Sequence, residues 1–252
     1  MTILAIANPK GGSAKTTTAV SIAGVLAEAG HRVLLVDLDP QGAATDWLLP
    51  ETRDAATVDV IDGHTAIDKV AAESIAPGLW VLSSSAGLAS SGAEELRLTR
   101  GLLRLLEDER DGWDTIVIDP PSGLGQLAVA PLAVADQVVV PVEAHALALA
   151  GVRTAVDTMQ RVRSGLNPRL RLAGIIACRV TRTAHSDAVL ERLDDHFPES
   201  LLRATVREDI RLAEAPSFRL PITRYAPRST GAIDYRAVVA ELGAREGVGA
   251  RD

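Results

Sequence analysis

The segment Asn8-Pro9-Lys10-Gly11-Gly12-Ser13-Ala14-Lys15-Thr16-Thr17 decides the fold. It stands between an apolar run over 2–7, which predicts a β-strand, and a helical pattern over 16–29. In that position Gly11 and Gly12 allow the main chain to turn its N–H groups toward an anion, and the helix presents the positive end of its dipole. The segment therefore predicts a phosphate-binding loop.

The loop departs from the general pattern G-x-x-x-x-G-K-[ST], because Pro9 and Ala14 occupy the two glycine positions. The variant K-G-G-x-x-K-T fits instead, with the additional Lys10 before the glycine pair. Lys15 can reach the β- and γ-phosphates, and the Thr16 hydroxyl can ligate Mg²⁺. Ala14 is strained if its position requires a positive φ. An ordinary glycine-rich turn would account for the glycines but not for the lysines and threonines, so we predict that the loop binds Mg-ATP.

Two further apolar runs end in aspartates. One ends at Asp37 and Asp39, the other at Asp119. Because strand carboxyl ends gather where a parallel sheet binds its ligand, we expect these acids near the phosphates. Asp37 and Asp39 alternate, so one is expected to support the loop and the other to face the nucleotide. Asp119 ends a strand of Walker B form and is expected to hold Mg²⁺ through a coordinated water. Each aspartate alone could equally be a helix N-cap or turn residue.

Apolar runs alternate with helical patterns along the rest of the chain. Strands are predicted over 2–7, 32–37, 79–83, 115–119, 137–142 and 172–177, and helices over 16–29, 93–110, 147–164 and 186–196. Gly30 fits the residue after a helix C-cap, and the segments 120–125 and 216–221 are expected to be loops. This order predicts an α/β fold with a doubly wound, mostly parallel sheet and helices on both faces, as in P-loop NTPases, in one domain over 1–252.

Composition excludes several other classes of protein. The chain has 252 residues, of which 47% are hydrophobic and 3% aromatic, so recognition of nucleic acid by base stacking is not expected. One cysteine, Cys178, excludes an intrachain disulfide or a cysteine-rich metal site. The first residues are too short for a signal peptide, no apolar run reaches membrane-spanning length, and no basic amphipathic C-terminal helix is present.

Charge is distributed unevenly along the chain. Residues 1–150 contain 9 Lys and Arg against 20 Asp and Glu, whereas residues 151–252 contain 17 Arg against 13 Asp and Glu, within a total net charge of −7. A basic C-terminal part could meet an anion that the rest of the chain repels, although an arginine-rich composition alone would give the same asymmetry.

Adenine is expected near the later strand ends, around Cys178-Arg179 and Val206-Arg207.

With these residues in view, the chain resembles the ParA family of partition ATPases, a branch of the deviant Walker A group that also includes MinD and nitrogenase iron protein. The resemblance runs from about residue 2 to 242. Besides the loop, it rests on Val36-Asp37-Leu38-Asp39-Pro40-Gln41-Gly42, Ile118-Asp119-Pro120-Pro121-Ser122, Pro141-Val142-Glu143, Gly165-Leu166-Asn167-Pro168 and Ile210-Arg211-Leu212-Ala213-Glu214-Ala215-Pro216-Ser217. The last of these segments is typical of the chromosomal, Soj-like branch and its short plasmid relatives.

The resemblance implies a role for each matching residue. Lys10 matches a signature lysine that reaches the partner's phosphates in an ATP-bound homodimer, and Gly11 a position where bulk would block closure. Asp39 matches the aspartate required for hydrolysis. Catalytic residues are thus Lys10, Lys15 and Asp39, and metal ligands are Thr16, Asp39 and Asp119. Nucleotide-binding residues are Lys10, Gly11, Gly12, Ser13, Ala14, Lys15, Thr16, Thr17, Arg179 and Arg207, and the cofactors are ATP and Mg²⁺.

The resemblance also implies partners. ATP-bound dimers would bind DNA non-specifically through Arg182 and Arg211, and a ParB-like centromere-binding protein would stimulate weak ATP hydrolysis. The protein would be cytoplasmic and nucleoid-associated, without membrane binding. Either arginine could instead be a solvated surface residue or form an intramolecular ion pair. Glu208 and Asp209 stand where Soj-like chains have Arg-Asn, which removes positive charge beside Arg211. Positioning of a protein cargo on the nucleoid and a MinD-like membrane switch are the alternative functions.

Overall fold

The computed structural model describes residues 1–50, 56–84, 88, 99–103, 112–121, 129–145 and 147–246. Of the helix predicted over 93–110, residues 99–103 are helical, and the remainder lies outside the described residues. The same is true of Ser122 and the end of the loop predicted over 120–125, and of the C-terminal residues 247–252.

The described strands form one seven-stranded sheet in the order β3-β4-β2-β5-β1-β6-β7. All neighbouring pairs are parallel except β3 with β4. Every strand predicted from the sequence is present, with ends within one residue of the prediction. The strands are β1 (Thr2–Ile6), β2 (Val33–Asp37), β3 (Ala72–Glu73), β4 (Leu79–Leu82), β5 (Thr115–Asp119), β6 (Gln137–Glu143) and β7 (Arg171–Cys178).

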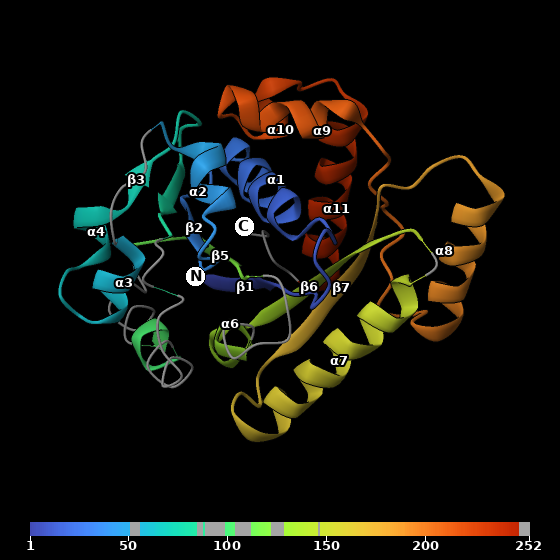
Figure 1. Cartoon of the computed structure of the whole chain (residues 1–252), viewed down its shortest axis with the longest axis horizontal. Helices are drawn as coiled ribbons and strands as arrows, with labels where there is room; N and C mark the ends of the chain where they lie inside the picture. Colours follow the sequence, from blue (N-terminus) through green and yellow to red (C-terminus); the bar gives the residue numbers. More distant parts are fainter. Residues whose placement is uncertain are drawn as a thin grey trace.

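Helices cover both faces of this sheet (Figure 1). One face carries α1 (Lys15–Glu28), α2 (Ala43–Leu48), α10 (Ile222–Tyr225) and α11 (Thr230–Glu246). The other carries α3 (Ala56–Ile61), α4 (Ile67–Val70), α6 (Val129–Val134) and α7 (Ala148–Gly165). Near the edge strand β7, α8 (Ala184–His196) packs beside α7, while α9 (Ile210–Glu214) and the 3₁₀ helix η3 (Ala215–Phe218) lead into α10.

The alternation of side chains along each strand explains the two covered faces. In β1, Leu4 and Ile6 belong to the core under α1, whereas Ile3 and Ala5 belong to the core on the opposite side. Strands buried on both faces need apolar residues at every position, and β2 and β5 are buried throughout. The predicted doubly wound, mostly parallel α/β fold is therefore confirmed.

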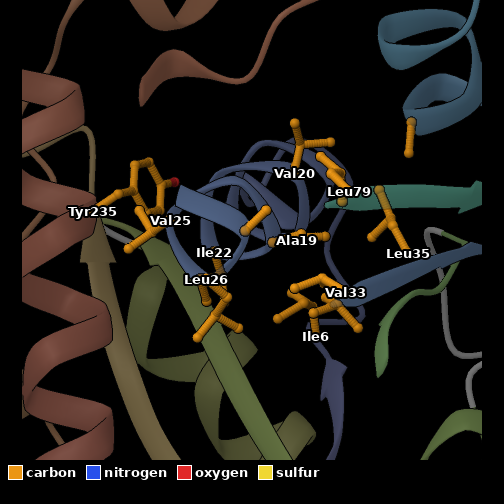
Figure 2. Packing of buried hydrophobic residues seen from close by; sticks show 14 of the residues in the cluster. Ile6, Ala19, Val20, Ile22, Val25, Leu26, Val33, Leu35, Leu79 and Tyr235 are labelled. Atoms are coloured by element: carbon orange, nitrogen blue, oxygen red, sulfur yellow. The ribbon is translucent and has the colours of Figure 1, made fainter. Parts of the chain in front are cut away.

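Helix α1 follows the phosphate-binding loop and is buried over most of its length (Figure 2). Gly30 follows its C-cap with a φ of 91°. The Gly30 N–H donates to the carbonyl of Ala27, and the His31 N–H donates to the carbonyl of Leu26. These two bonds form a Schellman motif, which confirms the predicted role of Gly30.

Several elements were not predicted from the sequence. Helix α11 contains Gly231 and Gly243, which weaken the helical signal, and it is stabilised by packing, with Tyr235 fully buried against α1. Strand β3 has only two residues and depends on pairing with β4. The loop predicted over 216–221 is incorrect in part, because its first residues lie in η3.

Candidate active site at the carboxyl ends of the strands

The loop between β1 and α1 has the backbone geometry that the sequence required of it. Gly12 has a φ of 74°, and Ala14, at the N-cap of α1, has a φ of 66°. The predicted cost of Ala14 is therefore real, of order 1–3 kcal/mol for a non-glycine residue in a sparsely populated region. The surrounding structure holds the loop, since Asn8 Oδ1 accepts from the Lys10 N–H and Asn8 Nδ2 donates to the Pro141 carbonyl.

Lys15 begins α1 and lies inside the loop. Its side chain is buried, and its Nζ donates to the Lys10 carbonyl at 3.3 Å. Burial lowers the pKa of Lys15, and the nearby carboxylates of Asp119 and Asp39 act in the opposite direction. A buried ammonium that is held beside main-chain N–H groups can neutralise a phosphate that displaces water from the loop.

Asp37 and Asp119 end neighbouring strands and are direct partners in the β2–β5 register. Asp119 has an exposed fraction of 0%, and neither carboxylate oxygen has a hydrogen-bond partner within bonding geometry. Burial raises the pKa of Asp119 to about 8, the Asp37 carboxylate raises it further, and the neighbouring Thr16 hydroxyl opposes this shift. A fully buried carboxylate without a well-formed hydrogen bond is costly, and a cation bound at this position would stabilise it.

These residues fit Mg²⁺ as a nucleotide-bound ion. Among the described residues, no three His, Cys, Asp or Glu side chains are grouped to hold a metal without further ligands. Mg²⁺ in nucleotide sites is bound by few side chains together with phosphate oxygens and water. Thr16 and Asp119 lie next to each other and would supply the protein's part of such a site. The third predicted ligand, Asp39, lies near Lys15.

Asp37 and Asp39 lie in different surroundings, in line with the alternation expected from the sequence. Asp37 is fully buried and accepts hydrogen bonds from the Thr45 N–H, the Thr45 hydroxyl and the Asp39 N–H, while its burial raises its pKa to about 6. It therefore supports the loop that follows β2. Asp39 is only half-buried, and its carboxylate accepts from the Gln41 N–H. Of the two, Asp39 is the one whose charge acts on Lys15.

Lys10 points away from the Lys15 side of the loop. Its Nζ lies 2.6 Å from His145 Nε2, and the same ring nitrogen lies 3.4 Å from a Glu143 carboxylate oxygen. No pattern in the sequence indicates this contact of His145. Only the fold brings residue 145, after β6, to residue 10, after β1, because β1 and β6 are neighbours in the sheet.

A cavity of about 760 Å³ extends from the loop toward the ends of the later strands. Gly12, Ser13, Ala14, Lys15, Thr16 and Thr17 line one end of it. Cys178, Arg179, Val206 and Arg207 line it farther along, where adenine was expected. Lys10, Gly11, Asp39 and Asp119 are not among its lining residues. The cavity has the size of a small-molecule site and joins the loop to both predicted adenine-side segments.

Sequence comparison with known proteins identifies the family of this chain. A family model described as an AAA domain matches residues 1–172. The chromosome-partitioning ATPase Soj of Thermus thermophilus is 40% identical over 243 residues, which cover 96% of this chain and 95% of that protein. The chromosome partitioning protein ParA of Caulobacter vibrioides is 35% identical over 252 residues, covering 97% and 94%. The chain belongs to the ParA/Soj family of ATPases.

A solved relative supports the same assignment. The structure named cobyrinic acid a,c-diamide synthase from Mycobacterium smegmatis, with bound ADP and magnesium, is 32% identical and has a TM-score of 0.82, covering 98% of this chain and 97% of that one. A second structure of that protein contains an ATP analogue with magnesium. The predicted family, ATPase activity and cofactor class are thereby confirmed for this ParA-family ATPase.

The residues predicted to lie near adenine are held by ion pairs in this ParA-family ATPase. Arg179, with a φ of 51°, donates to Glu143 at 2.9 Å and lies 3.5 Å from a Glu208 oxygen. Arg207 makes a bidentate pair with Asp234. The acidic partners Glu143 and Glu208 also line the cavity, together with Tyr235. Sequence reasoning missed these three, because their contribution depends on contacts between distant segments.

The two arginines predicted to bind DNA are both exposed. Arg182 lies just before α8. Arg211 is the second residue of α9 and pairs with Glu214 at 2.7 Å, and Glu214 also accepts from the Tyr225 hydroxyl. Neighbours of Arg211 in α9, among them Ile210, Leu212 and Ala213, line the nucleotide cavity. Helix α9 therefore contacts the cavity and carries an exposed cation.

Cys178 is a buried structural residue in the described part of the chain. It is 1% exposed, and burial raises the pKa of its thiol to about 12. Such a thiol stays protonated and does not act as a nucleophile at neutral pH. No helix in the described ranges is long and apolar enough to span a bilayer.

Proposed function

We propose that the chain is a partition ATPase that couples Mg-ATP binding to dimerisation and to non-specific DNA binding. Lys15, the loop amides, Thr16 and Asp119 would hold the triphosphate and Mg²⁺, and Asp39 would orient the attacking water. When bound, Mg²⁺ supplies charge neutralisation at the β- and γ-phosphate oxygens. The relatives named for chromosome partitioning, and the agreement of the site residues with that family, support this proposal.

Dimerisation is supported by the position of Lys10. Its ammonium group lies outside the cavity that the loop lines, beside His145, so it is not committed to a phosphate of its own chain. A cation supplied in trans stabilises the charge that develops during phosphoryl transfer. A Cβ added at Gly11 would meet nothing within 4 Å, so any requirement for glycine there comes from outside a single chain.

One observation carries the proposal of DNA binding: α9 lies between the nucleotide cavity and the Arg211 surface. A nucleotide against Ile210 and Leu212 would order this short helix and with it the guanidinium group. The two acids that stand in place of the expected Arg-Asn pair both have partners in the structure. Glu208 lies near Arg179, and Asp209 accepts from the Arg211 and Gly231 N–H groups as the N-cap of α9.

The proposed cellular setting follows from this function. The ATP-bound dimer would be in the cytoplasm on the nucleoid, where a ParB-like protein bound to a centromere-like sequence would stimulate hydrolysis. The proposed function does not include the synthase reaction named for the Mycobacterium smegmatis relative. The single cysteine of the present chain is buried and protonated, so it does not supply a thiolate that could release ammonia from an amide donor.

The test is fluorescence anisotropy with a random DNA duplex at low salt, in ATP, in ADP and without nucleotide. Wild type should bind only with ATP, with an affinity that falls steeply as salt is added. Each of the variants Arg211→Ala and Arg182→Ala removes one phosphate contact and should weaken DNA binding. The loss should be about tenfold for Arg211→Ala and smaller for Arg182→Ala. Arg161→Ala, at an exposed position on α7, is the matched control and should behave as wild type.

Size measurements by light scattering complete the test. Wild type should form a dimer with ATP, and Lys10→Ala should remain monomeric while it still binds the nucleotide. Absence of DNA binding by the ATP-loaded wild-type dimer at low salt would overturn the proposed DNA partner.

A further inference from the structure

Both peptide groups of Asp39 are bonded to side chains, one from the neighbouring Asp37 and one from the distant Ser84. Its N–H donates to Asp37 Oδ1 at 3.1 Å, and its carbonyl accepts from the Ser84 hydroxyl at 2.5 Å. Ser84 follows strand β4, 45 residues along the chain from Asp39. The loop after β2 is therefore tied to the end of a different strand at the residue that is proposed to orient water.

Ser84 is itself fixed by a closed set of hydrogen bonds. Its N–H donates to Thr45 Oγ1 at 2.9 Å, and the Thr45 hydroxyl donates its single hydrogen to Asp37 Oδ2 at 2.8 Å. The Thr45 N–H donates to the same Asp37 oxygen at 2.9 Å. Asp37, Asp39, Ser84 and Thr45 thus form a ring in which each residue is bonded to the next.

The ring is buried, whereas the group that it orients is not. Ser84 and Thr45 are 4% and 1% exposed, but Asp39 is half-buried. The direction of the Asp39 carboxylate therefore depends on where its own peptide groups are held. Reactive groups that move by about 1 Å can cost as much as a hundredfold in rate without changing ground-state binding.

We propose that Ser84 is a positioning residue for Asp39: it holds the Asp39 carbonyl and thereby aims the Asp39 carboxylate at the site of hydrolysis. Thr45 contributes indirectly to the position of Asp39, because it accepts the Ser84 N–H and so holds Ser84 in place. The inference rests on the proposed role of Asp39. Ser84 touches neither nucleotide nor water in this scheme, so its loss should change turnover rather than ATP affinity.

The experiment compares kcat for ATP hydrolysis and the dissociation constant for ATP in variants of the full chain. Ser84→Ala should lower kcat about tenfold and leave ATP affinity within about twofold, and Ser84→Thr, which keeps the hydroxyl, should restore most of the loss. Ser74→Ala is the matched control, because the Ser74 hydroxyl donates to the Ala76 carbonyl away from the site. It should leave both values unchanged. A wild-type kcat for Ser84→Ala would overturn the inference.

A second pair of variants covers the case in which Ser84→Ala does not fold. Thr45→Val removes the acceptor for the Ser84 N–H and should lower kcat, whereas Thr45→Ser keeps it and should remain active. Equal activity of these two variants would contradict the proposed ring.

Non-additivity separates positioning from general destabilisation. In an Asp39→Ala background, Ser84→Ala should cause no further loss of single-turnover hydrolysis, since the group that it aims is gone. A further tenfold loss there would show that Ser84 acts by another route. If Asp39→Ala alone hydrolyses ATP at the wild-type rate, the proposed function of Asp39 fails. If Asp39→Ala is inactive and Ser84→Ala is fully active, only the present inference fails.

Discussion

The carboxyl ends of β2 and β5 and the surface of α9 both carry charged side chains, but in opposite surroundings. At the strand ends, Lys15, Asp37 and Asp119 are buried, and burial shifts their pKa values away from the ordinary range. On α9, Arg211 is exposed and pairs with Glu214. Buried charges interact strongly with a phosphate, whereas exposed charges are screened and exchange partners easily.

This difference matches two kinds of binding. A site that must hold one triphosphate in one orientation benefits from few, fixed and desolvated charges. A surface that binds any DNA sequence needs phosphate contacts that form and break readily. The elements that follow these two regions along the chain are packed together: Trp47 of α2 donates to the Leu220 carbonyl, and Pro221 lies against Gly24 of α1.

Substitution of Lys15 is expected to have the largest effect on the contrast between buried and exposed charges. Lys15→Ala should reduce ATP hydrolysis by at least about a hundredfold, since a buried cation at the phosphates cannot be replaced by solvent. Lys69→Ala, at an exposed lysine on α4, should hydrolyse ATP normally. A colorimetric phosphate assay measures both variants, and comparable activities would mean that burial of the lysine is not what makes the site.

The pH dependence of stability tests whether the buried Asp119 carboxylate destabilises the folded protein when no cation is bound. Its pKa in the folded protein, about 8, is above the ordinary value of 3.8, so the folded state retains a proton that the unfolded state loses. Stability of the nucleotide-free protein should therefore fall as the pH rises from about 4 to about 8. Asp37, raised to about 6, adds to the lower part of this window.

Asp119→Asn should remove most of that decline and raise the free energy of unfolding at pH 8 by on the order of 1–3 kcal/mol, while it weakens Mg-ATP binding. Chemical denaturation at pH 5 and pH 8 measures this, with the exposed Asp46→Asn as control. A decline with pH in Asp119→Asn as steep as in wild type would refute the assignment.

The contact between α2 and the segment after η3 is tested at Trp47. Trp47→Phe loses the hydrogen bond to the Leu220 carbonyl and should lower the free energy of unfolding by about 1–2 kcal/mol. Trp113→Phe is a matched control, because Trp113 is also buried and its Nε1 has no partner within bonding geometry. Equal losses in the two variants would show that the Trp47 bond contributes nothing.

The smallest expected effect is at the exposed surface. Glu214→Gln removes the charge that pairs with Arg211 and should raise DNA affinity about threefold at low salt, since exposed pairs contribute little. Asp157→Asn, at an exposed acid on α7, should not change DNA affinity. The gain should disappear at high salt, and a gain that persists there would argue against a screened surface contact.

Local patterns in the sequence were sufficient for the parallel strands of the sheet and for the phosphate-binding loop. The strands are continuous apolar runs whose burial on both faces requires that pattern, and the loop needs its glycines and lysines at fixed spacing. The positive φ at Ala14 and the division of tasks between Asp37 and Asp39 also follow from chemistry within a few residues. These features were predictable because the interactions that define them are local.

Tertiary structure alone decided which distant residues meet at the site. Lys10 contacts His145, Ser84 holds Asp39, and Tyr235 reaches the nucleotide cavity from a helix with a weak signal of its own. A serine, a histidine or a tyrosine carries no pattern that indicates its partner 45 or 135 residues away. The strand order of the sheet determines which of these distant residues become neighbours in space. Packing of the whole chain selects that order, and no single segment does so.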